Sequence, residues 1–210
     1  MVVQMPEERY WDVIIVGGGP AGSTVARYAA EGGLRVLVID GRDPIGSPLQ
    51  CGELVPTNDE MRRLCPNVPD MDDLFRTSGD AISRIVTKMS IVPPNGKGLD
   101  YNFEGMVLDR VAHDKALVEL AISKGAEYHV GSRVDDVEGE YVILASGEKI
   151  RARIIVGAGG HNDPIRRKFW NEKSLNIPVK FVLMDGNHSA DVCYNKTSEV
   201  IIHGIKVDIA

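Results

Sequence analysis

The chain has 210 residues, of which 43% are hydrophobic and 26% are charged, so it can bury a substantial core and is not a disordered protein. Its 24 Lys and Arg residues and 30 Asp and Glu residues give a formal net charge of −6, which argues against binding to the phosphate backbone of nucleic acids. No apolar run approaches the roughly 18–20 residues that a membrane-spanning helix needs, and the polar start does not fit a secretory signal.

Cysteine and histidine residues exclude further classes of protein. Cys51, Cys65 and Cys193 are odd in number and have no paired spacing, so we expect no disulfide framework. The five histidines are scattered along the chain without a metal-ligand spacing, so we expect no metal site. We therefore expect a cytoplasmic protein, and the composition leaves open a peripheral contact with a membrane.

The first predicted elements form a βαβ unit. Residues 12–16 are a β-branched run typical of a buried parallel strand, and residues 35–39 are a second such strand. A helix is predicted between them over residues 20–31, because Pro20 suits its first turn and Gly32 suits its end.

The remaining elements alternate in type along the chain. Residues 41–56 are rich in Gly and Pro and predict an ordered loop, and residues 66–77 are turn-prone. Phe169 and Trp170, at the end of the last predicted helix, are interpreted as core anchors, with a membrane-facing edge as the alternative. The predicted helices are 57–64, 110–124 (between Asp109 and Gly125) and a short one from Asp163 to Trp170; the predicted strands are 82–92, 99–108, 127–130, a hairpin over 135–149 turning at Ser146-Gly147, 150–156, 179–184 and 200–209.

A glycine motif follows the first strand. Gly17-x-Gly19-x-x-Gly22 lies between a predicted strand and a predicted helix, which is the context that dinucleotide binding requires. Asp40 ends the second strand, where its carboxylate can accept hydrogen bonds from ribose hydroxyls and would repel a 2′-phosphate. The alternative, a glycine-rich turn that binds nothing, does not explain why strand, helix and acid are in register. Arg42 could offset the repulsion, or it could be an exposed loop residue.

Four segments carry a resemblance to a known family. The segment from Gly17 to Gly22, together with Asp40-Gly41-Arg42, resembles the start of flavoprotein oxidoreductases of the para-hydroxybenzoate hydroxylase type. The loop ending in Cys51-Gly52-Glu53 is similar to that of the geranylgeranyl reductase family, including archaeal lipid reductases and FixC-like proteins. The later segments Leu108-Asp109-Arg110 and Ile154 to Gly160, the latter followed by Arg166-Arg167, resemble two further motifs of that family.

This resemblance implies an α/β fold. A Rossmann-like FAD-binding domain would comprise residues 1–58 and 109–165, and part of a β-rich substrate domain would comprise residues 59–108 and 166–210. Cys51 and Glu53 would line the route between flavin and substrate as candidate catalytic residues; Cys51 could instead be a small buried residue, and Glu53 a solvated carboxylate. The residues expected to bind FAD are Gly17, Gly19, Pro20, Ala21, Gly22, Asp40, Gly41, Arg42, Cys51, Gly52, Arg110, Val134, Ala158 and Gly159.

The activity implied by the resemblance is reduction of isolated double bonds in geranylgeranyl and other isoprenoid chains. Reduced FAD would transfer the hydride, and NAD(P)H or ferredoxin would supply the electrons. The alternatives are an FAD-dependent monooxygenase of small ring substrates and a truncated, non-catalytic remnant of the fold.

Two departures from the family pattern stand out. The family usually has an acid at the position of Gly159, so carboxylate support for the cofactor is expected to be absent there. A late Gly-Asp motif is not found after Arg167, so the sequence resembles the N-terminal half of a reductase. His161, after the third motif, is interpreted as a turn residue, with an approach to the flavin as the alternative, and the oligomeric state stays open.

Overall fold

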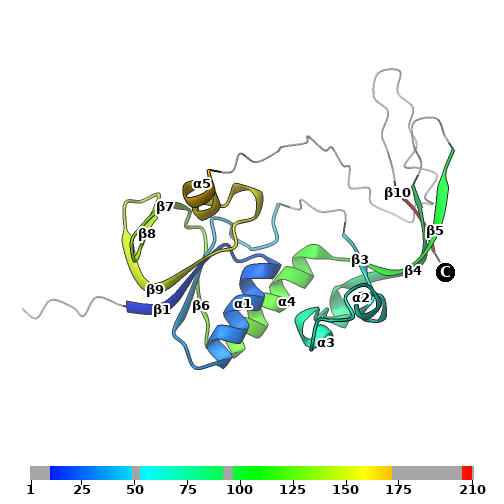
Figure 1. Cartoon of the computed structure of the whole chain (residues 1–210), viewed down its shortest axis with the longest axis horizontal. Helices are drawn as coiled ribbons and strands as arrows, with labels where there is room; N and C mark the ends of the chain where they lie inside the picture. Colours follow the sequence, from blue (N-terminus) through cyan, green and yellow to red (C-terminus); the bar gives the residue numbers. More distant parts are fainter. Residues whose placement is uncertain (1–9, 49–52, 92–96, 172–204, 210) are drawn as a thin grey trace, which may run out of the picture. The chain divides into compact units, whose positions relative to one another are not determined.

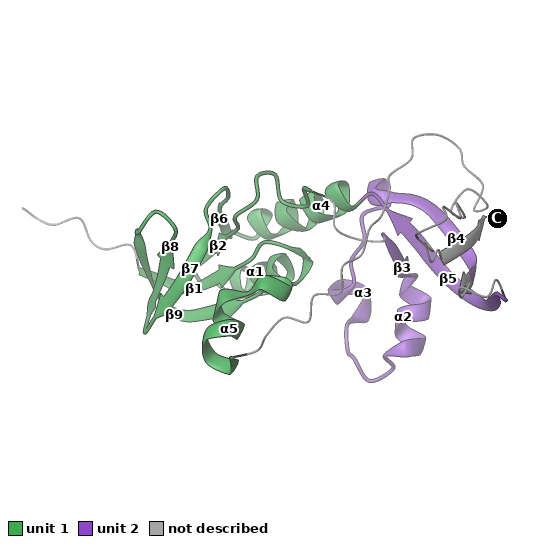
Figure 2. Ribbon diagram, turned by 90° about the horizontal axis from the view of Figure 1, so that it is seen from above, with its two compact units in different colours: residues 1–50, 110–176 green, residues 51–109, 177–210 purple. Residues whose placement is uncertain are grey.

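The chain forms two compact units, which Figure 2 distinguishes by colour. The structure is a computed structural model that describes residues 10–48, 53–91, 97–171 and 205–209. Unit 1 comprises residues 1–50 and 110–176, and unit 2 comprises residues 51–109 and 177–210. The strand predicted over residues 179–184 lies outside the described residues.

Unit 1 begins with the predicted βαβ unit: β1 (Tyr10–Val16), α1 (Pro20–Glu31) and β2 (Val36–Ile39) (Figure 1). The two strands are parallel, with Val13 opposite Val36 and Val16 opposite Ile39. Strands buried on both faces are apolar throughout rather than alternating, and all four residues of β2 are buried. The sequence prediction of this unit is confirmed.

Six strands make up the sheet of unit 1, in the order β6-β2-β1-β9-β8-β7. β6 (Glu127–His129), β2, β1 and β9 (Lys149–Gly157) are mutually parallel, whereas β8 (Tyr141–Leu144) and β7 (Val134–Glu138) are antiparallel to their neighbours. The α/β fold class, with its parallel sheet, is thereby confirmed.

The hairpin predicted over residues 135–149 needs a correction. Its strands turn twice: Gly139 lies between β7 and β8, and Gly147 lies between β8 and β9. Both glycines have positive φ angles, of 57° and 88°, which L-residues with a side chain rarely adopt. The second turn was predicted from Ser146-Gly147, whereas the first was not, because Gly139 is flanked by polar residues that suit an exposed strand equally well.

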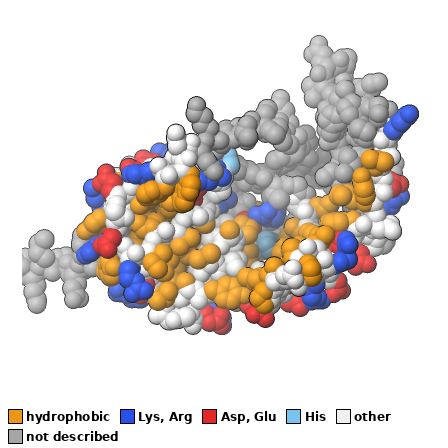
Figure 3. Space-filling model, in the orientation of Figure 1, with side chains coloured by type: hydrophobic (Ala, Val, Ile, Leu, Met, Phe, Trp, Pro, Cys, Tyr) orange, Lys and Arg blue, Asp and Glu red, His pale blue; other side chains and the backbone are white. Residues whose placement is uncertain are grey.

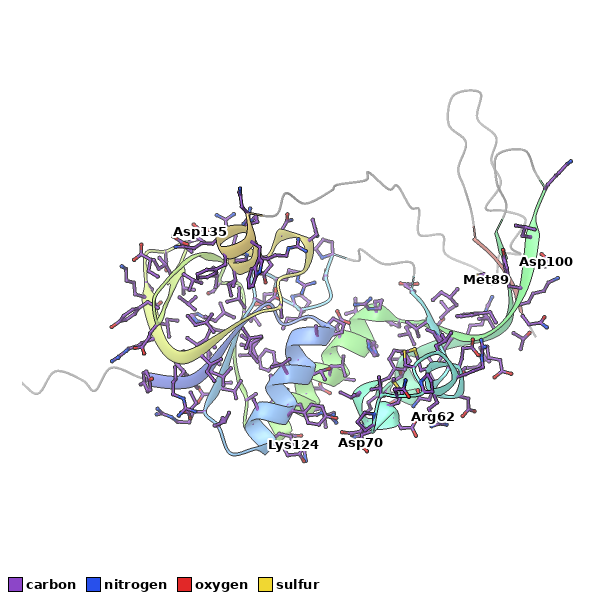
Figure 4. The ribbon with its side chains drawn as sticks, in the orientation of Figure 1. Arg62, Asp70, Met89, Asp100, Lys124 and Asp135 are labelled. Carbon is purple, nitrogen blue, oxygen red and sulfur yellow. The ribbon has the colours of Figure 1, made fainter. Side chains whose placement is uncertain are left out.

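Two apolar clusters cover the two faces of this sheet. On one face, α1 and α4 (Arg110–Ser123) pack against β1 and β2, and the ammonium group of Lys124 lies 2.7 Å from a carboxylate oxygen of Glu31 (Figure 4). On the other face, the β7–β8 hairpin and α5 (Pro164–Trp170) contribute Val134, Val137, Val142, Leu144 and Ile165 to a cluster with Trp11 and Ile39.

Unit 2 is a four-stranded antiparallel sheet with short helices. Its strands β3 (Leu54–Pro56), β4 (Ile82–Ile91), β5 (Leu99–Leu108) and β10 (Ile205–Ile209) lie in the order β10-β4-β5-β3. Helices α2 (Asn58–Leu64) and α3 (Met71–Leu74) precede a 3-10 turn, η1 (Gly79–Ala81).

Several further predicted elements are present in the structure. The two strands around residues 92–96 and the helices starting at residues 58 and 110 are confirmed. The loop over 41–56 ends in strand β3, and the turn-prone stretch 66–77 contains α3. The interpretation of Phe169 and Trp170 as core anchors is wrong, because their exposed fractions are 61% and 68%.

Surface charge is mixed. On the face drawn in Figure 3, acidic and basic side chains of the described residues are interspersed, and they form no single cationic patch. Within the described ranges, no helix is both long and apolar enough to cross a membrane.

Candidate functional site

The glycine motif forms a tight turn in which three parts of the backbone meet. Gly17 has a φ angle of +106°, and a Cβ atom placed on it would lie 2.4 Å from the carbonyl oxygen of Ala158 at the end of β9. A Cβ atom on Gly22 would lie 1.8 Å from the carbonyl oxygen of Gly17. Glycine at these two positions therefore lets β1, α1 and the end of β9 pack together without side chains between them.

The amino terminus of α1 opens at this turn. Its N-cap is Gly19, which has no side chain to cap the helix, Pro20 occupies the first turn, and that turn holds no acidic residue. The N–H groups of the first turn are left for another acceptor, and the helix dipole makes this end partly positive. Such an end suits a phosphate group.

Asp40 directly follows β2, beside the turn, and is 6% exposed. One carboxylate oxygen accepts hydrogen bonds from the Gly18 amide at 2.7 Å and from Nη2 of Arg42 at 2.9 Å. The other accepts from the amide and Nε of Arg42, at 2.8 and 3.0 Å. Burial by itself would raise the pKa of Asp40, but the hydrogen bonds from Arg42 and Gly18 outweigh it, so the pKa lies below its ordinary value. Asp40 is therefore a carboxylate at neutral pH.

A second set of hydrogen bonds holds the turn from the side of α1. The hydroxyl of Ser23 donates to the carbonyl of Gly18 at 2.9 Å, and the hydroxyl of Tyr128 lies 3.0 Å from that of Ser23. Burial raises the pKa of Tyr128, and the contact with Ser23 only partly offsets this, so the phenol stays neutral. The backbone of Gly18 is thus held through its amide by Asp40 and through its carbonyl by Ser23.

A cavity of about 860 Å³ opens around this turn, within the size range of cofactor sites. It is formed by the ends of β1, β2 and β9, where the carboxyl ends of parallel strands bind ligands in open α/β sheets. An uncapped helix end, a turn of glycines and a buried carboxylate fit the pyrophosphate and ribose of FAD. The predicted FAD-binding residues that line this cavity are Gly17, Gly19, Pro20, Ala21, Asp40, Gly41, Arg42, Val134, Ala158 and Gly159.

Other predicted residues lie elsewhere. Gly22 is buried beneath the turn, where it allows close packing rather than lining the cavity. Arg110 begins α4 and pairs with Asp114, its Nη2 lying 3.0 Å from a carboxylate oxygen, and it does not line the cavity. Cys51 and Gly52 lie outside the described residues. Glu53 belongs to unit 2, where its carbonyl accepts from the Leu108 amide at 2.9 Å.

Two further arginines at the cavity were not predicted from the sequence. Arg133 and Arg167 line it, and Arg133 pairs with Asp135 at 2.9 Å. His161, for which a turn position and an approach to the flavin were both open, also lines it. Arg133 precedes the predicted Val134, and Arg167 follows the third motif, but their orientation towards the cavity depends on how β7 and α5 pack. Arg42 and Arg133 are paired with Asp40 and Asp135, which also line the cavity, so Arg167 gives this lining a small positive surplus that suits an anionic cofactor.

Comparison with known proteins agrees with this geometry. A family model of pyridine nucleotide-disulphide oxidoreductases matches residues 11–158, which include the glycine turn, Asp40 and the end of β9. The chain belongs to this oxidoreductase family. The prediction of an FAD-dependent oxidoreductase is therefore confirmed.

Individual relatives narrow the similarity to geranylgeranyl reductases. The digeranylgeranylglycerophospholipid reductase of Methanosarcina acetivorans is 34% identical over 179 residues, covering 79% of this chain and 41% of that protein. An uncharacterized protein in the nifH2 5′ region of Methanosarcina barkeri is 36% identical over 166 residues, and the match covers 78% of this chain and 89% of that protein. The resemblance to the geranylgeranyl reductase family is confirmed.

Solved structures point the same way. A geranylgeranyl bacteriochlorophyll reductase-like protein from Thermoplasma acidophilum has a TM-score of 0.58 and 31% identity, over 71% of this chain and 39% of that one. An FAD-bound halogenase, with a TM-score of 0.56 and 21% identity over 76% of this chain and 36% of that one, shares the fold. The chain spans about two fifths of the length of the named reductases that it matches.

Proposed function

We propose that this chain is the FAD-binding part of a reductase that acts on isolated double bonds of geranylgeranyl or related isoprenoid chains. The observation that carries the proposal is the cavity at the glycine turn, lined by a buried carboxylate and an uncapped helix end, in a chain similar to named digeranylgeranylglycerophospholipid reductases. FAD would supply hydride transfer to an alkene carbon when bound. The named reductase relatives, rather than the cavity, favour this activity over the monooxygenase alternative.

The residues of the cavity divide the binding of FAD among them. The Gly19 amide and the first turn of α1 after Pro20 would hold the pyrophosphate, because a helix end of this kind presents N–H groups to an anion. The amides of Gly17 and Gly18 already donate to the Ile39 carbonyl and to Asp40 and shape the turn instead. Asp40 would accept hydrogen bonds from the adenosine ribose, and the backbone at Val134 would flank the adenine. Arg42 keeps the buried charge of Asp40 neutralised, which limits its repulsion of the pyrophosphate.

The substrate side of the proposal rests on the sequence resemblance. Cys51 and Glu53 would line the route between flavin and an isoprenoid lipid, with Cys51 as a weak candidate proton donor. NAD(P)H or ferredoxin as electron donor, and peripheral contact of a cytoplasmic protein with a membrane, belong to the same proposal.

The test uses the whole chain loaded with FAD and reduced without oxygen. We expect a lipid bearing geranylgeranyl chains to reoxidise the flavin, seen by visible absorption, and to gain hydrogen, seen by mass spectrometry. The matched control is the same lipid with saturated chains, which should leave the flavin reduced. If the unsaturated lipid leaves the flavin reduced as well, the proposed activity is wrong for this chain. Oxygen consumption driven by NAD(P)H and a small ring substrate would favour a monooxygenase instead.

A further inference from the structure

A buried carboxylate lies beneath the turn that follows β9. Asp163 is 4% exposed, and its two oxygens serve different neighbours. Oδ2 accepts a hydrogen bond from the amide of Gly159 at 2.6 Å, while Oδ1 accepts from the amide of Arg166 at 2.8 Å. The second contact caps α5, which is a common role for an aspartate before a helix. The first contact lies outside the helix and is not needed for capping.

The carboxylate occupies the space that side chains would fill on the two glycines of this turn. A Cβ atom on Gly157 would lie 2.9 Å from Oδ1 of Asp163, and one on Gly159 would lie 3.1 Å from Oδ2. Ala158 and Gly159 line the cofactor cavity, whereas Asp163 does not. Asp163 therefore contacts the far side of the backbone that faces the cavity.

The same backbone also packs against the glycine turn after β1. Gly157 is opposite Val16 in the sheet, and the amide of Ala158 donates to the carbonyl of Val16 at 2.8 Å. The carbonyl of Ala158 is the group that a side chain on Gly17 would strike. A displacement of residues 157–159 would therefore move one wall of the cavity and remove the support of Gly17.

We propose that Asp163 is a positioning residue for the cofactor. Its carboxylate holds the Gly159 amide, and through it the turn at residues 158–160, against the cavity. Position 159 itself is a glycine and has no carboxylate. The turn is supported instead by the carboxylate of Asp163, four residues further along the chain and on the side away from the cavity. This inference rests on FAD binding at the cavity, which is part of the proposed function, but not on any isoprenoid substrate.

The decisive variant is Asp163→Ser. Serine caps helices about as well as aspartate, so α5 keeps its cap. Its side chain is one atom shorter and has one oxygen in place of the two that bind the separate amides of Gly159 and Arg166, so the contact with Gly159 is lost. Asp163→Asn is the second variant, because it keeps the size of the side chain while turning one acceptor into a donor. The control is Val142→Ala, which removes buried volume from the same unit at a residue that does not line the cavity.

Three measurements decide the proposal: FAD affinity by flavin fluorescence, thermal unfolding by tryptophan fluorescence, and hydrogen exchange of the Gly159 amide in the chain without FAD. We expect both Asp163 variants to bind FAD about tenfold more weakly, because FAD must then order the released turn at a cost comparable to one hydrogen bond to a charged group. We also expect their Gly159 amide to exchange faster. Val142→Ala should lower the unfolding temperature while leaving FAD affinity and Gly159 exchange close to wild type.

The proposal is overturned if the Asp163 variants keep wild-type FAD affinity or wild-type exchange at Gly159. It is also overturned if Val142→Ala weakens FAD binding by the same factor, because the effect would then follow from stability alone. Failure of the lipid reaction with intact FAD binding would contradict the proposed activity and leave this inference standing. If the wild-type chain binds no FAD, both the proposed function and the role of Asp163 in positioning the cofactor are wrong.

Discussion

Gly22→Ala should destabilise unit 1 more than its small size suggests. The added methyl group would lie 1.8 Å from the carbonyl oxygen of Gly17, although real Cβ atoms essentially never approach other atoms within 3.0 Å. Relief requires α1 to move away from β1 by about an ångström, or the glycine turn to open. Overpacking of this kind costs about 1–3 kcal/mol. Alanine within a helix is more stabilising than glycine by roughly 0.5–1 kcal/mol, which offsets part of this cost. We therefore expect the free energy of unfolding to fall by about 1–2 kcal/mol.

The assay is urea unfolding followed by tryptophan fluorescence. The chain has two tryptophans, Trp11 and Trp170, and both belong to unit 1. Trp11 is 8% exposed, so its emission should change strongly when this unit unfolds. FAD titration of the same protein should show weaker binding, because the displaced turn carries Gly17 and Gly19 at the cavity.

The matched control is Gly32→Ala at the other end of α1. A Cβ atom there would lie 3.4 Å from the carbonyl oxygens of Ala29 and Tyr28, an ordinary contact, and the φ angle of −74° suits alanine. We expect its unfolding free energy to stay within about 0.5 kcal/mol of wild type. If Gly22→Ala is as stable as Gly32→Ala and binds FAD equally well, close packing at the glycine turn does not determine the site.

Three further changes test the charges of unit 1. Asp40→Asn should cost about 2 kcal/mol in unfolding free energy and weaken FAD binding, because an amide donor would face the donors that the carboxylate now satisfies; wild-type values in denaturation and FAD titration would refute this. Arg42→Met should cost about 1 kcal/mol or less, since Arg42 is 39% exposed, but NMR titration should show the pKa of Asp40 rising. The folded-state pKa of Asp40 is lowered, so its stabilisation is present above its unfolded pKa and is lost as the pH falls through the folded value. Burial lowers the pKa of His113, the attraction of Asp114 offsets this only in part, and the repulsion of Arg110 lowers the pKa further. Because the folded-state pKa lies below the unfolded value, the wild type should lose stability as the pH falls below about 6.5. In the same denaturation series, His113→Gln should lose less.

The βαβ unit, the glycine motif and the acid after the second strand could all be predicted from the sequence. Each depends on neighbours in the chain: an apolar run before Gly17, a helix start at Pro20, and a second strand ending at Asp40. The resemblance to geranylgeranyl reductases could also be read from short motifs. Such local patterns are predictive because turn geometry restricts which residues fit, and because the period of buried residues differs between helices and strands.

The turn at Gly139 and the exposure of Trp170 were not predictable in this way. A polar stretch with one glycine suits either a turn or an edge strand, and an aromatic residue at a helix end is buried only if another element covers it. Both outcomes depend on how the hairpin and α5 pack on the sheet.

Sequence alone therefore determined which residues form the nucleotide-binding unit, because strand, turn and helix are local consequences of residue order. Only the tertiary structure decided what Arg42, Arg167 and Asp163 do. The guanidinium of Arg42 lies on Asp40, Arg167 lines the cavity, and Asp163 lies behind the cavity wall. The physical reason is that parallel strands bring their carboxyl ends together at one edge of the sheet, and side-chain packing then selects which neighbouring charges face that edge.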